Sequence, residues 1–305
     1  MSRKQLEKII DLVKTRNREI QDKQFTLEER RAWIDAGCKL FENLDNIKTE
    51  HIDANGVPAE WVTAKGVNPE NVILYLHGGG YVLGSIASHR GSAANLSRAT
   101  NSRVLLLGYR LAPEHTFPAA VEDAEKAYQW LLGKGVDPSQ LIVCGDSAGG
   151  GLTVSLLVVL RDKGAPLPAG GVCISPWVDM EAKGNSMDSK ADLDPVIQRE
   201  GILDFSSAYL GGADPKSPLA APLYANLIGL PPLLIQVGTA ETLLDDATRL
   251  AHHAKTCGVK VTLEVWKDMI HVWHRFSGSL SEADQAIDRI GEYVYGILYP
   301  KESSP

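Results

Sequence analysis

The chain has 305 residues, of which 44% are hydrophobic, and its 31 basic and 38 acidic residues give a formal net charge of −7. This hydrophobic content is enough for one large or two ordinary domains, and it excludes a disordered chain, a collagen-like fibre and a small disulfide-bonded scaffold. The acidic balance gives no general attraction to phosphate backbones, so we expect no nucleic-acid partner.

Neither a targeting segment nor a membrane span is evident in the sequence. The N-terminal residues mix both charges and lack the apolar stretch of a secretory signal. The most apolar helical stretch, residues 148–160, is well short of the roughly 20 residues that cross a bilayer. Four cysteines lack the spacing of a zinc site and fit small buried hydrophobic residues in a reducing compartment, namely Cys38, Cys144, Cys173 and Cys257. We therefore expect a cytoplasmic protein without a membrane span or a metal site.

Two helices are predicted in the first 45 residues. Apolar side chains between residues 6 and 13 recur at the spacing of one helical face. Thr26 and Glu29 have the spacing of a capping box, and apolar residues at helical spacing follow them. The chain is therefore expected to begin with one helix followed by another.

From about residue 57, short apolar runs alternate with helical stretches. The runs typical of strands are residues 60–63, 72–77, 103–108, 141–145, 171–175, 233–237 and 261–266. Several are apolar almost throughout, which is typical of strands buried on both faces. Residues 121–131 and 243–254 have the spacing of amphipathic helices. This alternation predicts an α/β fold with a mostly parallel sheet and helices on both faces.

The segment between Trp177 and about Leu223 interrupts this alternation. It contains no convincing strand and is rich in aspartate, glycine and proline. Insertions of this kind over a sheet often form lids or caps, so we expect one here.

The motif G-x-S-x-G joins an apolar strand to a helix at Gly145–Gly149. In so tight a turn the serine takes strained backbone angles, and the residues two before and two after it must lack a Cβ. The turn lifts the hydroxyl of Ser147 clear of the sheet and directs the N–H of Ala148 toward a developing oxyanion. We therefore predict that Ser147 is a nucleophile and that Ala148 is an oxyanion donor.

Three consecutive glycines follow His77 at the end of another apolar strand. Such a run has a conformational-entropy cost, but it suits a loop whose N–H groups must approach a ligand closely. We predict that Gly79 and Gly80 are the other oxyanion donors, that Gly78 makes the turn and that His77 braces the loop. A phosphate site is disfavoured because neither GxGxxG nor GK[ST] is present.

The general base is sought in a loop beyond a late strand, because the expected chain order is serine, acid, histidine. His271 follows the last predicted strand and fits best. His274 is the alternative base. The acid should follow the strand at residues 233–237, where Glu241 and Asp245 are both candidates and Glu241 stands nearer the strand end.

Several of these motifs together resemble the hormone-sensitive-lipase-like family of esterases, a branch of the α/β-hydrolases. The matching stretches are HGGGY at 77–81, YRLAPEHTFPAAVEDA at 109–124, GDSAGG at 145–150, SPWVD at 175–179 and DMIHVW at 268–273. The family usually has D-P-L-x-D-E where this chain has residues 241–246. By that register Glu241, one methylene longer than the usual aspartate, takes the place of the acid.

The resemblance implies an α/β-hydrolase fold with a mostly parallel eight-stranded sheet under a helical cap. It implies Ser147 as nucleophile, His271 as base, and Gly79, Gly80 and Ala148 as oxyanion donors. The expected division is N-terminal cap helices over 1–50, catalytic core over 51–184, cap insertion over 185–220 and catalytic core over 221–305.

The function expected from the residues and the resemblance is hydrolysis of short- to medium-chain acyl esters, with no metal or organic cofactor. Candidate pocket residues are Tyr81, Val82, Leu83, Trp177 and Ile270. A non-catalytic receptor and an amide hydrolase on the same triad are the alternatives. The partner is a small-molecule ester, and the last strand suggests a possible homodimer because edge strands often form dimer seams.

Overall fold

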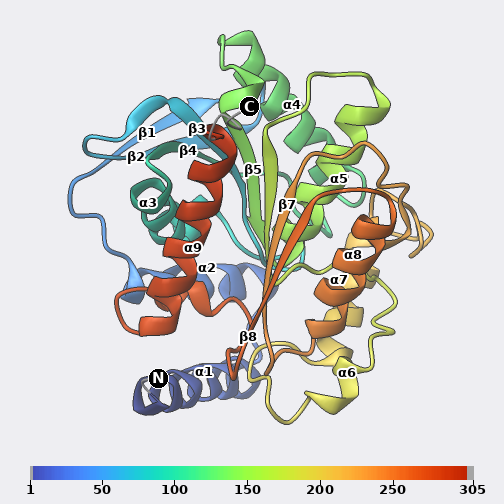
Figure 1. Cartoon of the computed structure of the whole chain (residues 1–305). Coiled ribbons are helices and arrows are strands. Elements are labelled where there is room, and N and C mark those ends of the chain that lie inside the picture. Colours follow the sequence, from blue (N-terminus) through green and yellow to red (C-terminus); the bar gives the residue numbers. More distant parts are fainter. Residues whose placement is uncertain (1–2, 301–305) are drawn as a thin grey trace.

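An eight-stranded sheet runs through the centre of the protein in the computed structural model, which describes residues 3–300 (Figure 1). The strands are β1 (Ile47–Asp53), β2 (Pro58–Ala64), β3 (Asn68–Leu76), β4 (Ser102–Leu107), β5 (Leu141–Asp146), β6 (Gly170–Ile174), β7 (Leu233–Gly238) and β8 (Val261–Trp266). Their spatial order is β1-β2-β4-β3-β5-β6-β7-β8. β2 pairs antiparallel with β1 and β4, and every other pairing is parallel. The predicted mostly parallel eight-stranded sheet is confirmed.

The apolar runs in the sequence correspond to β2 through β8, whereas β1 has no such run. Its sequence, IKTEHID, leaves most side chains exposed because the strand lies at one edge of the sheet. β1 is held in the sheet by its antiparallel pairing with β2, which runs from Ile47 opposite Ala64 to Asp53 opposite Pro58. The expected domain boundary at residue 50 therefore falls inside a strand.

The helices are α1 (Arg3–Lys23), α2 (Leu27–Cys38), α3 (Ile86–Thr100), α4 (Ala119–Gly133), α5 (Ala148–Asp162), α6 (Ser186–Ser189), α7 (Arg199–Leu210), α8 (Leu244–Thr256) and α9 (Ser281–Leu298). Four short 3₁₀ helices are η1 (Lys39–Phe41), η2 (Pro138–Gln140), η3 (Pro222–Tyr224) and η4 (Trp273–Phe276). None of the helices within residues 3–300 combines the length and hydropathy that a membrane span requires.

Alternate side chains of each central strand enter two different hydrophobic cores. In β3, Leu74 and Leu76 join the core that contains buried residues of α4, α5 and α8. Ile73 and Tyr75 join the core that contains residues of α3 and α9. Both faces of the sheet are thus covered by helices, as the nearly continuous apolar character of its strands predicts (Figure 1).

The first 45 residues and the segment between Trp177 and Leu223 both form helices, and these lie at one end of the molecule. α1, α2, α6 and α7 all lie in the lower half of Figure 1. The predicted capping box begins α2, with the Thr26 hydroxyl accepting from the Glu29 N–H and the Glu29 carboxylate accepting from the Thr26 N–H. Arg31 of α2 donates to the carbonyls of Val82 and Ala112 at 2.8 Å each. These bonds attach α2 to the loops that follow β3 and β4.

Candidate active site

Ser147 lies at the turn between β5 and α5, with φ 52° and ψ −119°. A Cβ on Gly145 would lie 2.2 Å from the carbonyl oxygen of Gly149, and one on Gly149 would lie 1.9 Å from that of Leu76. The Ser147 N–H donates to the Ile174 carbonyl at 2.8 Å, which fixes the turn to β6. The strained serine between two obligatory glycines has the geometry that the sequence predicts.

A histidine from a distant segment contacts the serine hydroxyl. His271 lies in the loop between β8 and η4, and its Nε2 is 3.0 Å from Oγ of Ser147. Both side chains are largely buried, with 5% and 8% of their surface exposed. A neutral imidazole at this distance can accept the hydroxyl proton directly.

Glu241 occupies the other side of the imidazole ring. Its Oε2 is 2.9 Å from Nδ1 of His271, and its Oε1 accepts from Oγ of Ser175 at 2.8 Å and from the Gly238 N–H at 2.6 Å. The Ser175 hydroxyl in turn accepts from the Val272 N–H at 3.2 Å. Ser175 thereby holds both the carboxylate and the histidine loop, a role that the sequence analysis did not anticipate.

Burial and the charge of Glu241 have opposite effects on the pKa of His271. Burial lowers the pKa of His271, but the hydrogen bond to Glu241 and its negative charge outweigh that effect, so the pKa lies above its ordinary value. Glu241 is completely buried. A carboxylate here fixes the tautomer with a proton on Nδ1 and stabilises the imidazolium that forms when His271 takes a second proton.

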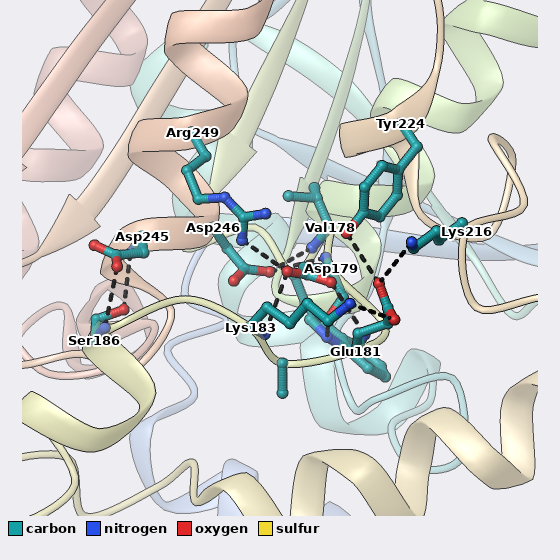
Figure 2. A network of polar contacts seen from close by, with 12 residues as sticks. Val178, Asp179, Glu181, Lys183, Ser186, Lys216, Tyr224, Asp245, Asp246 and Arg249 are labelled. Atoms are coloured by element: carbon teal, nitrogen blue, oxygen red, sulfur yellow. Dashed lines mark hydrogen bonds and ion pairs between the residues drawn. The ribbon is translucent and has the colours of Figure 1, made fainter.

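The other two carboxylates of this segment face away from the histidine. Oδ2 of Asp245 accepts from the Ser186 N–H at 3.1 Å, and the Ser186 hydroxyl accepts from the Asp245 N–H at 2.9 Å. Oδ2 of Asp246 accepts from the N–H groups of Val178 and Asp179 at 2.9 and 3.0 Å. Figure 2 shows both carboxylates joining α8 to the segment that follows β6.

His274, the alternative base, is hydrogen-bonded elsewhere. Its Nε2 lies 2.7 Å from Oε1 of Gln236 in the middle of β7. Burial lowers the pKa of His274 to about 3, so its ring is neutral. Its contacts are those of a buried structural residue.

Asp146, the variable position of the G-x-S-x-G motif, connects the serine turn to the glycine loop. Its Oδ1 accepts from the Tyr75 hydroxyl at 2.8 Å and from the Gly78 N–H at 3.1 Å. His89 of α3 lies 3.5 Å from its other oxygen. The role of Asp146 is not evident from the sequence, because only the fold brings the ends of β3 and β5 together.

The glycine loop is braced by stacked rings. His77 stacks on Tyr109 with centroids 4.2 Å apart, and the Tyr109 hydroxyl donates to the His77 carbonyl at 2.7 Å. Burial, with the nearby His89, lowers the pKa of His77 to about 3. Gly79 and Gly80 have φ +117° and +64°. Their N–H groups and that of Ala148 donate to no acceptor within residues 3–300, which leaves three amides free for a ligand.

Ser147 and His271 open into a cavity of about 240 Å³ under the N-terminal helices and α7. Of the five pocket candidates, Leu83 and Trp177 line this cavity. Tyr81, Val82 and Ile270 do not line it, and their side chains pack in the hydrophobic cores.

Much of the apolar cavity wall comes from the N-terminal helices and from α7, for which the sequence predicted helices and a cap but no pocket residues. Apolar side chains of the wall from α1, α2, η1 and α7 are Leu12, Val13, Ile20, Trp33, Ile34, Phe41, Ile202 and Phe205. An amphipathic pattern shows which side of a helix is apolar, but not whether that side covers a core or an open cavity. Within residues 3–300 no cluster of three or more His, Cys, Asp or Glu side chains is suited to a metal ion.

Comparisons with known proteins agree with this arrangement. Residues 73–275 match a family model described as alpha/beta hydrolase fold. An acetyl-hydrolase from Streptomyces hygroscopicus is 41% identical over 298 residues, covering 96% of this chain and 97% of the relative. The crystal structure of an esterase from the bacterial hormone-sensitive lipase family is 49% identical, has a TM-score of 0.95, and is matched over 98% of this chain and 99% of that one. The structure of EstE5 from a crystal soaked with p-nitrophenyl butyrate is 46% identical, with a TM-score of 0.91 and coverage of 96% and 98%.

Proposed function

The chain belongs to the α/β-hydrolase fold family, as a carboxylic ester hydrolase of its hormone-sensitive-lipase-like branch, and from this premise we propose that it hydrolyses short- to medium-chain acyl esters through Ser147, His271 and Glu241. The observation that carries the proposal is the hydrogen-bonded chain from Oγ of Ser147 through both ring nitrogens of His271 to Glu241, at 3.0 and 2.9 Å. Nucleophile, base and orienting acid are the three parts that acyl transfer requires.

In the first half of the reaction, Oγ of Ser147 attacks the ester carbonyl while Nε2 of His271 takes the hydroxyl proton. The carbonyl oxygen becomes an oxyanion, which the N–H groups of Gly79, Gly80 and Ala148 stabilise by about 3–4 kcal/mol for each effective donor. The tetrahedral intermediate then collapses. The bond to the alcohol oxygen breaks, and the alcohol leaves with the proton from His271.

In the second half, water replaces the alcohol. His271 takes a proton from water, the hydroxide attacks the acyl carbon, and the same amides hold the second oxyanion. The bond to Oγ of Ser147 breaks, and Ser147 regains its proton from His271. No residue changes oxidation state, and the products are one carboxylic acid and one alcohol.

The size of the cavity supports the proposed acyl range. A volume of about 240 Å³ fits a short chain and lies below the roughly 300–1,000 Å³ that is typical of small-molecule sites. EstE5, whose crystal was soaked with p-nitrophenyl butyrate, and the acetyl-hydrolase relative agree with short acyl groups.

The proposal is tested with p-nitrophenyl esters of two to sixteen carbons. We expect kcat/KM to peak at eight carbons or fewer, and a serine-reactive organophosphate to label Ser147 and stop turnover. Ser147→Ala should remove turnover and labelling while leaving the circular dichroism spectrum unchanged. Full activity of Ser147→Ala would refute the nucleophile, and a peak at sixteen carbons would refute the acyl range. Binding without product release would favour a receptor, and faster cleavage of matched amides would favour an amidase.

Three further properties belong to this proposal. We divide the chain into an N-terminal cap segment that ends before β1, a cap insertion over 185–220, and a catalytic core that runs from β1 to 184 and over 221–305. Residues 1–2 and 301–305 lie outside those described. We propose a cytoplasmic location, because all four cysteines are free. We also propose a homodimer formed through β8, which is an edge strand.

A further inference from the structure

Three arginine side chains line the cavity without a carboxylate at ion-pair distance. They are Arg16 of α1, Arg30 of α2 and Arg275 of η4. Among residues 3–300, none of the three forms an ion pair with an aspartate or glutamate. The one carboxylate in the wall is that of Asp146, which is already hydrogen-bonded by Tyr75 and Gly78. The wall of the cavity therefore carries more positive than negative charge in a protein whose net charge is −7, although Glu19 and Asp204 outside the wall attract Arg16 and Arg30.

Arg16 is fixed in place by its own surroundings. Its guanidinium stacks on the ring of Trp33 at 3.6 Å from the centroid, and its Nη2 donates to the Trp33 carbonyl at 3.1 Å. Gly37 provides the space, since a Cβ there would lie 1.8 Å from Nη2 of Arg16. Most of the five N–H donors of this guanidinium remain available. An immobilised guanidinium loses little entropy when it binds an anion.

Arg275 reaches the same part of the cavity from the catalytic side. It follows His271 by four residues, and its Nη2 contacts Sγ of Cys38 at 2.6 Å. A thiol is a weak acceptor, so this contact leaves most of the guanidinium unsatisfied. Burial lowers the pKa of Arg16 below its ordinary value; Cys38 and Glu19 oppose this effect, and the positive charge of Arg275 adds to it. Two cations thus face one another across a cysteine.

Arg30 adds a third positive charge nearer the oxyanion loop. Its Nε is buried and has no hydrogen-bond partner among the described residues. Its guanidinium lies 5.2 Å from the ring centroid of Phe205, and the same ring lies 2.4 Å from where a Cβ on Gly80 would be. A buried donor without an acceptor is costly unless a ligand supplies one.

Neutral aliphatic esters would supply no counter-charge to these guanidinium groups. Removing guanidinium groups from water without a counter-ion is unfavourable. We propose that the cavity takes esters that carry a carboxylate remote from the scissile bond, and that Arg16 and Arg275 bind this carboxylate while Arg30 adds to the positive field. The planar guanidinium fork matches a carboxylate in shape and charge. This inference rests on the proposed esterase function and names its substrate class.

The experiment uses two matched pairs of esters. The acyl-side pair is mono-4-nitrophenyl adipate and the 4-nitrophenyl ester of adipic acid monoamide. The alcohol-side pair is 4-acetoxybenzoate and 4-acetoxybenzamide. We expect kcat/KM of the wild type to favour the carboxylate in at least one pair, and the pair that responds shows which side of the ester carries the anion.

The arginines are then tested singly. In Arg275→Met and Arg16→Met we expect the carboxylate-to-amide ratio of kcat/KM to fall roughly tenfold, as for loss of one charge-assisted hydrogen bond. Arg275→Lys keeps the charge without the fork and should retain part of the preference. The matched control is Arg18→Met, which removes the same charge from an exposed position on α1 outside the cavity wall and should leave the ratio unchanged.

If the arginine variants fail to fold, the salt dependence of KM in the wild type still tests the proposal. Because salt screens charge pairs, KM for the carboxylate-bearing ester of the responding pair should rise with the sodium chloride concentration. KM for the amide-bearing ester of the same pair should stay constant. Equal or lower kcat/KM for the carboxylates in both pairs, or a ratio that Arg275→Met and Arg16→Met leave unchanged, would overturn the inference. In that case, cleavage of the ester bond in the two neutral esters that carry an amide group would still support the esterase function. No hydrolysis of any of the four esters would overturn the proposed function as well.

Discussion

Glu241 is one methylene longer than an aspartate would be at this position, and its Oε2 lies 2.9 Å from Nδ1 of His271. The extra methylene is accommodated because Oε1 is held at the same time by the Ser175 hydroxyl and the Gly238 N–H. A carboxylate with three hydrogen bonds and no exposed surface has little freedom to move. Its role can therefore be tested by changing its charge without changing its shape.

In Glu241→Gln, kcat should fall on the order of 10³–10⁴-fold, because an amide can no longer fix the imidazole tautomer or stabilise the imidazolium. The pH dependence of the residual activity should also change. His271 acts as a base only when neutral, and the charge of Glu241 raises its pKa, so loss of that charge should shift the acidic limb of the kcat/KM profile to lower pH. Steady-state rates between pH 5 and pH 9 measure both effects.

The matched control for this prediction is Asp245→Asn, four residues further along the chain. That change alters a side chain bound to Ser186, and kcat should fall far less than in Glu241→Gln. The reverse ranking of the two variants would move the acid to Asp245.

The residues of the proposed triad could be located from the sequence because each follows a strand and carries a local signature. Ser147 lies between two glycines, and His271 follows the last strand. Asp146 and Ser175 could not be predicted in this way. Their partners, Gly78 and Val272, lie 68 and 97 positions away, and only the sheet order brings them into contact.

At the scale of elements, α8 is joined to the segment after β6 by a buried group of charges (Figure 2). Asp246 of α8 accepts two backbone N–H groups from that segment, while Arg249, one turn further on, forms an ion pair with Asp179 at 2.7 Å. One oxygen of Asp246 has no hydrogen-bond partner among the described residues. Two buried carboxyl groups thus share one guanidinium.

This arrangement makes the stability of the junction depend on pH. Burial raises the pKa of Asp246 from 3.8 to about 7, and the nearby Asp179 adds to the rise. The unfolded chain therefore releases this proton at lower pH than the folded protein, so the contribution of Asp246 to the free energy of unfolding falls as the pH rises from about 4 to 7 and is constant above. The loss is on the order of a few kcal/mol.

Asp246→Asn should remove that loss, because asparagine is neutral and its oxygen can still accept from Val178 and Asp179. The variant is expected to be more stable than the wild type at pH 8, by up to a few kcal/mol, and to lose this advantage toward pH 4. Urea unfolding of both proteins at pH 5, 6.5 and 8 measures the difference. A difference that does not change with pH would mean that Asp246 is ionised in the folded protein over this whole range.

Among the elements, the sequence was most informative where a strand is buried on both faces. β5 and β7 are apolar almost throughout and were predicted to within one residue of their bounds. β1 was not predicted from its residues, because an edge strand with charged, exposed side chains has no apolar run. The cap helices could be predicted as helices, but the cavity that they cover depends on how three separate segments meet.

At the scale of the whole molecule, the two edges of the sheet differ in chemistry. Four consecutive residues of β1, 48–51, are exposed, and three of them are Lys48, Glu50 and His51. Charged side chains on an edge strand discourage pairing with another chain. β8 alternates apolar residues along its length, and Val265 is 46% exposed. Of the two edges, β8 is therefore the one suited to an isologous dimer.

The proposed dimer predicts a mass of about 66 kDa, twice the 33.1 kDa of the chain, in size-exclusion chromatography with light scattering. Val265→Lys should shift this mass toward the monomer, because a charge facing its symmetry-related copy across a dimer seam is repelled, while an exposed position tolerates lysine in the single chain. Thr49→Lys places the same charge on the exposed edge strand β1 and should leave the mass at the dimer value. A wild type of about 33 kDa at micromolar concentration would exclude the dimer, and a dimer that withstands Val265→Lys but not Thr49→Lys would place the seam on the other edge.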